Sequence, residues 1–265
     1  MAGLCAGLGA AAAARGAPAV GVAAAANLSY ALGALDAEFG KSHPETAVTA
    51  AVGASGGLVA QIRNGAPYDV FLSADPEYAL ALVASGDADP ASLTPFAVGR
   101  LVLWTTREGL DVADIAAAVR SPSVHALAIA NPASAPYGRA ARQALEKLGL
   151  WAEARPKLVT GENISQAVQF VDTGSADAGF VALSAVLSAK LRGRGRWQEV
   201  PAALYDPLTQ VAVVTARGRS NPAAALYVGF LRSAPARAIL ERFGYGHPPG
   251  EAGAGSAPAA PPPPS

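Results

Sequence analysis

Four short segments of this sequence carry the residue types from which an anion site can be built. They span residues 23–28, 52–57, 135–138 and 160–164, and each consists of small or polar residues where a strand is expected to end and a helix to begin. The first N–H groups of a helix have no partner inside the helix, and the helix dipole places partial positive charge there. Such an end attracts an anion. Four converging ends could hold a small dianion without any charged side chain.

The elements that must position these segments alternate along the chain. Apolar runs predict strands, and apolar residues at helical spacing predict helices, with Asp75 as the cap of one of them. Alternation of this kind indicates an α/β protein with a parallel sheet covered on both faces. The expected strands are 20–25, 47–52, 69–72, 100–105, 124–130, 157–160, 178–182, 198–201 at an edge, and 208–215. The expected helices are 27–39, 58–63, 75–83, 112–119, 138–148, 164–171, 223–232 and 236–243, and residues 85–95 are expected to form a loop.

The alternation restarts near residue 98, which predicts two lobes. We expect lobe 1 to contain residues 21–97 and 208–247, and lobe 2 to contain residues 98–207. A chain that crosses twice between lobes makes a hinged cleft, in which ligands bind outside the carboxyl ends of the strands.

Composition excludes several classes of function. The 265 residues hold 20 Lys plus Arg and 20 Asp plus Glu, so nothing indicates a nucleic-acid partner or an anionic membrane surface. The single cysteine, Cys5, allows neither an internal disulfide nor a cysteine metal site. The three histidines, His43, His125 and His247, have no ligand spacing, so we expect neither a bound metal cation nor a cofactor.

The two ends of the chain differ in composition from the rest. Residues 1–20 are an Ala/Gly run that resembles the apolar part of a secretory signal, although the usual basic start is missing. A leader without structure is the alternative. Residues 248–265 are Pro, Ala, Gly and Ser with one charge, a composition typical of a disordered tail.

Several stretches together resemble a known family. They are residues 53–58 (Gly-Ala-Ser-Gly-Gly-Leu), the run 61–75 that ends in Val-Phe-Leu-Ser-Ala-Asp, Asn131-Pro132, Pro136-Tyr137-Gly138, residues 161–164 (Gly-Glu-Asn-Ile) and residues 242–245 (Arg-Phe-Gly-Tyr). Over roughly residues 20–246 the chain resembles the molybdate-binding proteins of bacterial ABC importers. The resemblance implies a type II periplasmic-binding-protein fold with two lobes, parallel-rich sheets flanked by helices and a hinged cleft.

The resemblance also implies the site. Family members hold a tetrahedral oxyanion with hydroxyls and backbone amides, and the matching positions here are Asn27, Ser55, Tyr137 and Ile164. Some members add a tyrosine donor from a later strand, where this chain has Ala182. That departure resembles a sub-group that uses Asn and the tyrosine of Pro-Tyr-Gly instead.

The function that the resemblance implies is capture of molybdate or tungstate and delivery to an ABC permease in the membrane. We expect a periplasmic or extracytoplasmic monomer that is not an enzyme and whose ligand is the oxyanion. Taken separately, the same residues have ordinary interpretations as a helix cap, a turn residue, a packing ring and a core residue.

Hydrogen-bond chemistry favours the same ligand class independently. Molybdate is fully deprotonated at neutral pH and only accepts hydrogen bonds, so a site made of donors satisfies it. Hydrogen phosphate carries a proton and needs an acceptor. The one carboxylate in the four segments, Glu162, is expected to face solvent. Sulfate is also a deprotonated dianion, so a protein for another tetrahedral oxyanion such as sulfate remains an alternative.

A second alternative is an α/β serine hydrolase. Residues 53–57 fit the G-x-S-x-G pattern with Ser55 as nucleophile, and Asp206 and His247 follow in the order Ser, Asp, His. His247 borders the Pro-rich tail, however, and too few strands precede Ser55 for a hydrolase sheet. In the helix after Tyr137 we expect Arg139 and Arg142 to face solvent, and the basic run 192–196 to be a solvated loop.

Overall fold

The computed structural model describes residues 19–248. The predictions for the secretory signal or leader, for Cys5 and for the tail beyond Pro248 lie outside the described residues. Within them, no helix is long and apolar enough to cross a bilayer.

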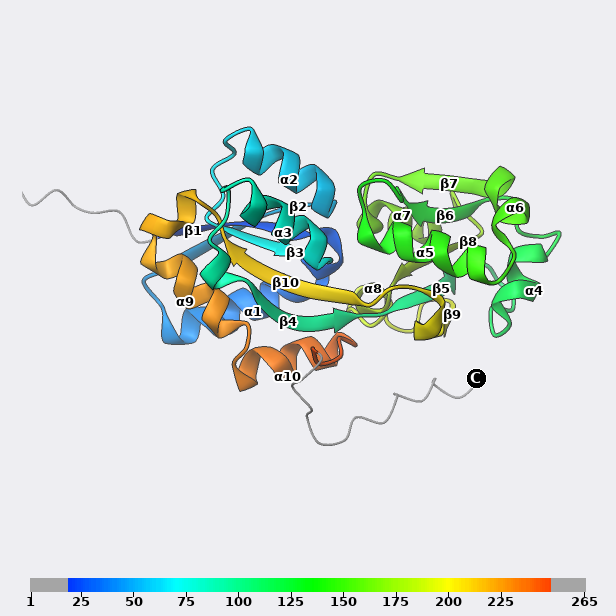
Figure 1. The fold of residues 1–265 in the computed structure, drawn as a ribbon. Coiled ribbons are helices and arrows are strands. Elements are labelled where there is room, and N and C mark those ends of the chain that lie inside the picture. The colour runs from blue at the N-terminus through cyan, green and yellow to red at the C-terminus, as the bar shows by residue number, and fades with distance from the viewer. Residues whose placement is uncertain (1–18, 249–265) are drawn as a thin grey trace, which may run out of the picture.

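The strands between residues 19 and 248 form two five-stranded sheets that lie side by side in Figure 1. The first sheet has the order β2-β1-β3-β10-β4 and the second the order β7-β6-β8-β5-β9. We name the elements around these sheets the first lobe and the second lobe. The strands are β1 Ala19–Ala25, β2 Ala47–Gly53, β3 Val70–Ser73, β4 Thr94–Gly99, β5 Leu101–Thr105, β6 Leu127–Ala130, β7 Leu158–Gly161, β8 Ala178–Ala182, β9 Arg196–Glu199 and β10 Leu208–Val214.

Helices cover both sheets. The α-helices are α1 Ser29–Ser42, α2 Ser55–Arg63, α3 Pro76–Ala84, α4 Ile115–Arg120, α5 Pro136–Lys147, α6 Trp151–Ala154, α7 Ile164–Asp172, α8 Leu183–Val186, α9 Pro222–Phe230 and α10 Ala234–Arg242. Short 3-10 turns are η1 Ala26–Leu28, η2 Pro90–Ser92, η3 Arg155–Lys157, η4 Ala202–Leu204 and η5 Arg217–Ser220. In Figure 1, α2 and α3 lie on one side of the first sheet, and α1 and α10 on the other.

Alternating side chains of β1 explain why the first sheet is covered twice. Val22 and Ala24 pack into a core with α1, α9 and α10, whereas Ala23 between them packs into a second core with α2 and α3. Successive residues of a strand point to opposite faces, so a strand that is apolar throughout must be buried on both. The second lobe has one large core, which also takes in Ala25, Ala26 and Ala74 from the first lobe.

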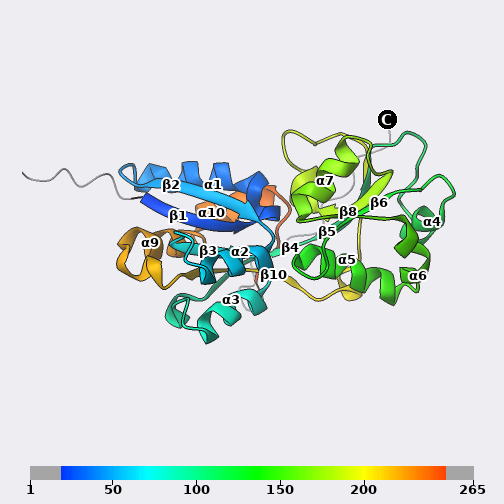
Figure 2. The same ribbon diagram turned by 90° about the horizontal axis from the view of Figure 1, so that it is seen from above.

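The two lobes are joined where strands of both sheets meet. Gly99 ends β4 in the first sheet, and Leu101 begins β5 in the second, so Arg100 is the only residue between them. The chain returns through residues 205–207 into β10, which pairs antiparallel with both β3 and β4. Figure 2 shows β4, β5 and β10 running between the lobes.

Three sequence predictions about these elements were wrong in detail. Residues 94–99 form β4, where a loop and linker were expected because Pro95 and Gly99 are uncommon in strands. This strand lies at the edge of its sheet, where proline is tolerated. The sheets are mixed, because β10 and β5 run antiparallel to their neighbours. Helix α2 begins at Ser55 and not at residue 58. Its first turn was not predicted, because Gly56 and Gly57 are poor helix formers.

Candidate functional site

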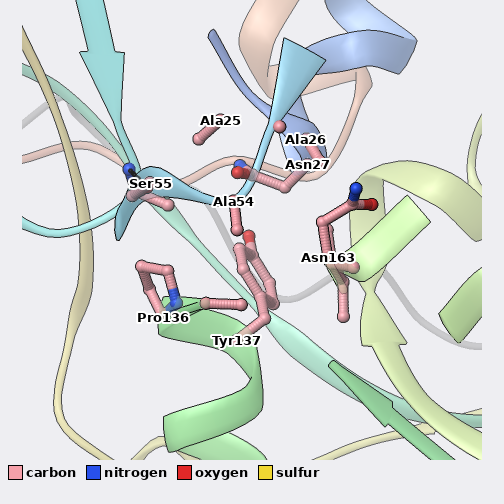
Figure 3. Close-up of a pocket in the computed structure, with 12 residues that line it drawn as sticks. Ala25, Ala26, Asn27, Ala54, Ser55, Pro136, Tyr137 and Asn163 are labelled. Carbon is pink, nitrogen blue, oxygen red and sulfur yellow. Dashed lines mark hydrogen bonds between the residues drawn. The ribbon is translucent and has the colours of Figure 1, made fainter. Parts of the chain in front are cut away.

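The four predicted segments meet at one pocket between the lobes. The empty space there, open solvent included, is about 200 Å³. Asn27, Ser55, Tyr137 and Ile164 all line it, two from each lobe, and Figure 3 shows the side chains of Asn27 and Tyr137 pointing toward one another. The other lining residues are Ala25, Ala26, Gly53, Ala54, Ala74, Ala135, Pro136 and Asn163.

Most of the turns and helices that begin at the pocket lack a side-chain cap, as α6 and α8 do elsewhere, whereas α7 at the pocket is capped by Asn163. Three turns or helices that begin at the pocket, η1, α2 and α5, follow Ala25, Ala54 and Ala135, none of which makes a side-chain cap hydrogen bond. Helices α3, α4, α9 and α10 are capped by side chains of Asp75, Asp114, Asn221 and Ser233, respectively. Alanine is among the poorest N-cap residues. The first-turn N–H groups of η1, α2 and α5 therefore have no side-chain partner, and in α2 that of Gly56 is already bonded to Ser134 O.

The second lobe presents one amide from each of two helices. In α5 the first residue, Pro136, has no N–H, so Tyr137 carries the first amide of that helix. In α7 the side chain of Asn163 accepts from the N–H groups of Ser165 and Gln166 at 3.0 and 3.2 Å. The amide of Ile164 precedes them and stays outside this cap. The Ile164 side chain itself is buried in the core of the second lobe.

The hydroxyl of Ser55 is oriented by its neighbour. Ser55 is fully buried, and its Oγ accepts a hydrogen bond from the backbone N–H of Ala74 at 3.2 Å. No acceptor for the Ser55 O–H occurs among the described residues. The proton is therefore free to point into the pocket, so Ser55 can donate to an anion.

Asn27 lies in a buried hydrogen-bond network. Its Nδ2 donates to Gln210 Oε1 at 2.8 Å and to the hydroxyl of Tyr245 at 2.9 Å. Gln210 gives its own Nε2–H to Leu208 O, and Tyr245 gives its O–H to Asn27 O, so both neighbours offer only lone pairs to Nδ2. This fixes the orientation of the Asn27 amide and uses both of its hydrogens. The carbonyl of Asn27 also accepts from Ser184 Oγ on α8, which links the lobes.

Tyr137 is a neutral group throughout the physiological range. Burial raises the pKa of its hydroxyl well above the usual value, and the nearby hydroxyls of Tyr245 and Tyr205 add to that rise, while Asn27 opposes it. The hydroxyl lies against the linker between the lobes, because a Cβ added to Gly99 would collide with it. Tyr137 thus packs against the crossing point as well as lining the pocket.

None of the residues from 19 to 248 that line the pocket has a charged side chain. Glu162, the one carboxylate of the four segments, is exposed and absent from the lining, as predicted. Arg142 is also exposed as predicted and pairs with Glu146 at 2.7 Å. Arg139 was expected in solvent, but it is half-buried in ion pairs with Asp75 and Glu77 of the first lobe, because α5 packs close to the start of α3.

The residues of the hydrolase alternative do not form a catalytic group. Asp206 accepts from Gln143 Nε2 at 2.6 Å, and His247 Nε2 lies 3.1 Å from a carboxylate oxygen of Glu241. No hydrogen bond between residues 19 and 248 joins Ser55 to either of them. Ser55 therefore lacks the adjacent base that a serine nucleophile needs.

Several residues of the pocket and its support were missed at the sequence level. The alanines of the lining could not be predicted as site residues, because they contribute by lacking a side chain that would cap the helix. Asn163 had a signal, since an Asn before a helix start is a typical N-cap. Gln210 had one too, as the lone amide in the apolar strand β10.

A family model described as bacterial extracellular solute-binding protein matches residues 20–246, which is most of the chain. The chain belongs to this family.

Within this family, the chain is similar to molybdate-binding proteins in particular. The molybdate-binding protein ModA of Azotobacter vinelandii is 42% identical over 228 residues, 86% of this chain and 89% of that protein. ModA of Rhodobacter capsulatus is 44% identical over 198 residues, 75% of this chain and 77% of that protein. The solved periplasmic molybdate-binding protein of Azotobacter vinelandii superposes with a TM-score of 0.81 at 35% identity, over 86% of this chain and 99% of that one.

These findings confirm the predicted resemblance and the two-lobed fold. Solute-binding proteins of this family are extracellular, which supports the expected extracytoplasmic location. The relatives named above are binding proteins and not enzymes, so the hydrolase alternative is not favoured.

Proposed function

We propose that this protein is an extracytoplasmic solute-binding protein that captures molybdate or tungstate and delivers it to an ABC permease, and that it has no enzymatic activity. One observation carries the proposal: four helix starts, three of them without side-chain caps, converge on a small pocket that no charged side chain of residues 19–248 lines. The relatives with 42% and 44% identity are both molybdate-binding proteins.

The proposed donors come from both lobes. In the first lobe they are the Ser55 hydroxyl and first-turn backbone amides of η1 and α2. Because both side-chain hydrogens of Asn27 are already used, Asn27 contributes its backbone N–H and shapes the η1 turn. In the second lobe they are the amides of Tyr137 and Ile164. The amides only donate, and the Ser55 hydroxyl, whose Oγ already accepts from the N–H of Ala74, offers its proton, which suits an oxyanion without a proton.

Closure of the lobes completes the site. The open cleft admits the anion to the first lobe, and the starts of α5 and α7 then close over it. Closing removes water, and the lower local dielectric strengthens each hydrogen bond to the charged oxygens. The permease recognises the closed arrangement of the lobes, which the ligand makes the dominant one. A monomer suffices for this mechanism.

Titration calorimetry with molybdate, tungstate, sulfate and phosphate tests the proposal. We expect tight 1:1 binding of molybdate and tungstate, and weaker binding of sulfate, whose smaller ion leaves the donors of the two lobes too far apart. Phosphate should bind more weakly, because its proton meets few acceptors at the site, such as the unpartnered Oδ1 of Asn27. Sulfate binding within tenfold of molybdate, about 1.4 kcal/mol, contradicts the size argument. No heat with any of the four anions contradicts the assignment itself.

A further inference from the structure

One ion-pair cluster joins the two lobes beside the pocket. Arg139 on α5 of the second lobe pairs with Asp75 at the start of α3 in the first lobe, and its Nη1 also lies 3.0 Å from Glu77 Oε2. Apart from Arg100 in the linker, which pairs with Glu199, the other ion pairs between described residues each stay within one lobe, for example Arg107 with Asp177 and Arg142 with Glu146. Arg139 therefore makes the charged contact that exists only while the lobes are closed.

The cluster adjoins the proposed donors on both sides. Asp75 directly follows Ala74, which lines the pocket and donates its N–H to Ser55 Oγ. Arg139 lies two residues after Tyr137, whose amide begins α5. A shift of Arg139 relative to Asp75 would therefore move the donors of the two lobes relative to each other.

The Asp75 carboxylate is held in place by its own helix. Its Oδ1 accepts from the backbone N–H of Glu77 at 2.8 Å as the N-cap of α3, and the side chain is only 10% exposed. Its other oxygen, Oδ2, faces the Arg139 guanidinium. A carboxylate this buried is costly unless a cation offsets it. Arg139 supplies that cation.

A second contact of the same surface is uncharged. The backbone N–H of Gly56 in α2 donates to Ser134 O, in the turn before α5, at 3.0 Å. A Cβ on Gly56 would lie 3.1 Å from Ser134 O and from Tyr78 Cε1 of α3, so the lobes approach each other closely here. The ion pairs of Arg139 therefore add to a direct contact between α2 of the first lobe and the turn before α5 of the second.

We propose that Arg139 is a positioning residue that holds the donors of the two lobes together, so that its ion pairs with Asp75 and Glu77 slow release of the bound anion. The inference rests on the proposed oxyanion-binding function. The ion pairs form after capture, so they lower the dissociation rate and leave the association rate nearly unchanged.

Stopped-flow measurement of both rate constants on the full chain with molybdate tests this role. Arg139→Gln removes the cation and leaves Asp75 unpaired beside the anion, so the dissociation rate should rise about tenfold. Arg142→Gln is the matched control, because it makes the same change in net charge one turn further along α5 and removes only a contact within the second lobe. Its dissociation rate should stay within twofold of wild type, and the two variants should share one association rate.

Asp75→Asn distinguishes loss of the ion pair from loss of the fold, because Asn is as good an N-cap as Asp and keeps α3 capped. This variant loses the ion pair but also loses the charge that repels the anion, so we expect about a threefold faster dissociation. The double variant Arg139→Gln/Asp75→Asn should match Asp75→Asn alone, since Arg139 then has no buried carboxylate to offset. Raising the salt concentration should speed release from wild type more than from the double variant.

Two results would overturn the role of Arg139: a dissociation rate in Arg139→Gln equal to that of Arg142→Gln, or rates in the double variant that are the product of the single effects. If no oxyanion binds to wild type, the proposed function fails, and small-angle scattering without anion then decides on Arg139. A larger radius of gyration in Arg139→Gln than in Arg142→Gln would support the interlobe role, and equal radii would refute it.

Discussion

Asn27 Nδ2 donates to Gln210 Oε1 across 2.8 Å, and this bond ties the pocket to the strand by which the chain re-enters the first lobe. Gln210 is fully buried and holds its own orientation through Leu208 O at 2.7 Å. Asn27 Nδ2 also donates to the hydroxyl of Tyr245, which follows α10. Gln210 and Tyr245 thereby decide which atoms Asn27 can offer to a ligand.

The Asn27–Gln210 bond predicts the effect of Gln210→Met. This change keeps the volume of the side chain but leaves Asn27 Nδ2 and Leu208 O each without one partner. Unsatisfied buried polar groups cost about 1–3 kcal/mol, so the free energy of unfolding should fall by about that much, and anion affinity should fall as the η1 turn loosens. Urea unfolding and calorimetry measure the two effects. Gln198→Met on β9, a half-buried site in the second lobe, should change neither.

The free O–H of Ser55 predicts a direct loss of affinity in Ser55→Ala. A hydrogen bond to a charged partner contributes about 1.5–3 kcal/mol, which corresponds to roughly a ten- to hundredfold higher dissociation constant. Ser85→Ala, at the exposed end of α3, is the control and should bind like wild type. Unaltered affinity in Ser55→Ala would remove Ser55 from the site.

Ester hydrolysis and probe labelling of wild type and Ser55→Ala test the hydrolase alternative. Ser55 has no neighbouring base among residues 19–248, so we expect wild type to leave simple esters intact and to remain unlabelled by a fluorophosphonate probe. Labelling at Ser55 that disappears in Ser55→Ala would favour an enzyme.

Adjacent glycines in α2 give a matched pair of variants. In Gly56→Ala the new Cβ would press on Ser134 O of the other lobe at 3.1 Å, whereas in Gly57→Ala it would meet nothing within 4 Å. We therefore expect Gly56→Ala to weaken anion binding by about three- to tenfold, because the lobes no longer close fully. Gly57→Ala should bind normally and unfold no more easily, since Ala favours a helix over Gly. Equal affinities in both variants would show that closure does not need this contact.

Affinity should depend little on pH near neutrality. The one titratable side chain in the lining is Tyr137, and burial raises the pKa of its hydroxyl well above 10. Because the folded protein holds this proton more tightly than the unfolded chain, the neutral form and its stabilising effect are complete below about pH 10 and are lost only at higher pH. Calorimetry at pH 6, 7 and 8 should therefore give one dissociation constant. A steep change with a midpoint near about 6.5 would instead indicate a histidine at the site.

Strand–helix junctions in the sequence predicted the four segments of the pocket, and the family resemblance named the residues within them; that these residues bind a ligand stays a prediction. Asn27, Ser55, Tyr137 and Ile164 line one pocket because each lies where a strand ends and a helix begins, and such junctions of neighbouring strands share one edge of a sheet. The network around Asn27 could not be predicted, because Gln210 and Tyr245 reach it only through pairing of β10 with β3 and docking of the C-terminal segment. Arg139 was misassigned for a related reason, since its partner Asp75 belongs to the other lobe.

Anomalous diffraction from crystals grown with molybdate tests the central claim most directly, because the molybdenum atom itself is located. We expect a single peak in the pocket, with the oxyanion oxygens about 2.7–3.2 Å from Ser55 Oγ and from backbone nitrogens of η1, α2, Tyr137 and Ile164. We expect no charged side chain in contact with the ion. A peak outside the pocket, or one whose ligands are Arg or Lys side chains, would contradict the claim that uncharged donors at helix starts bind the anion.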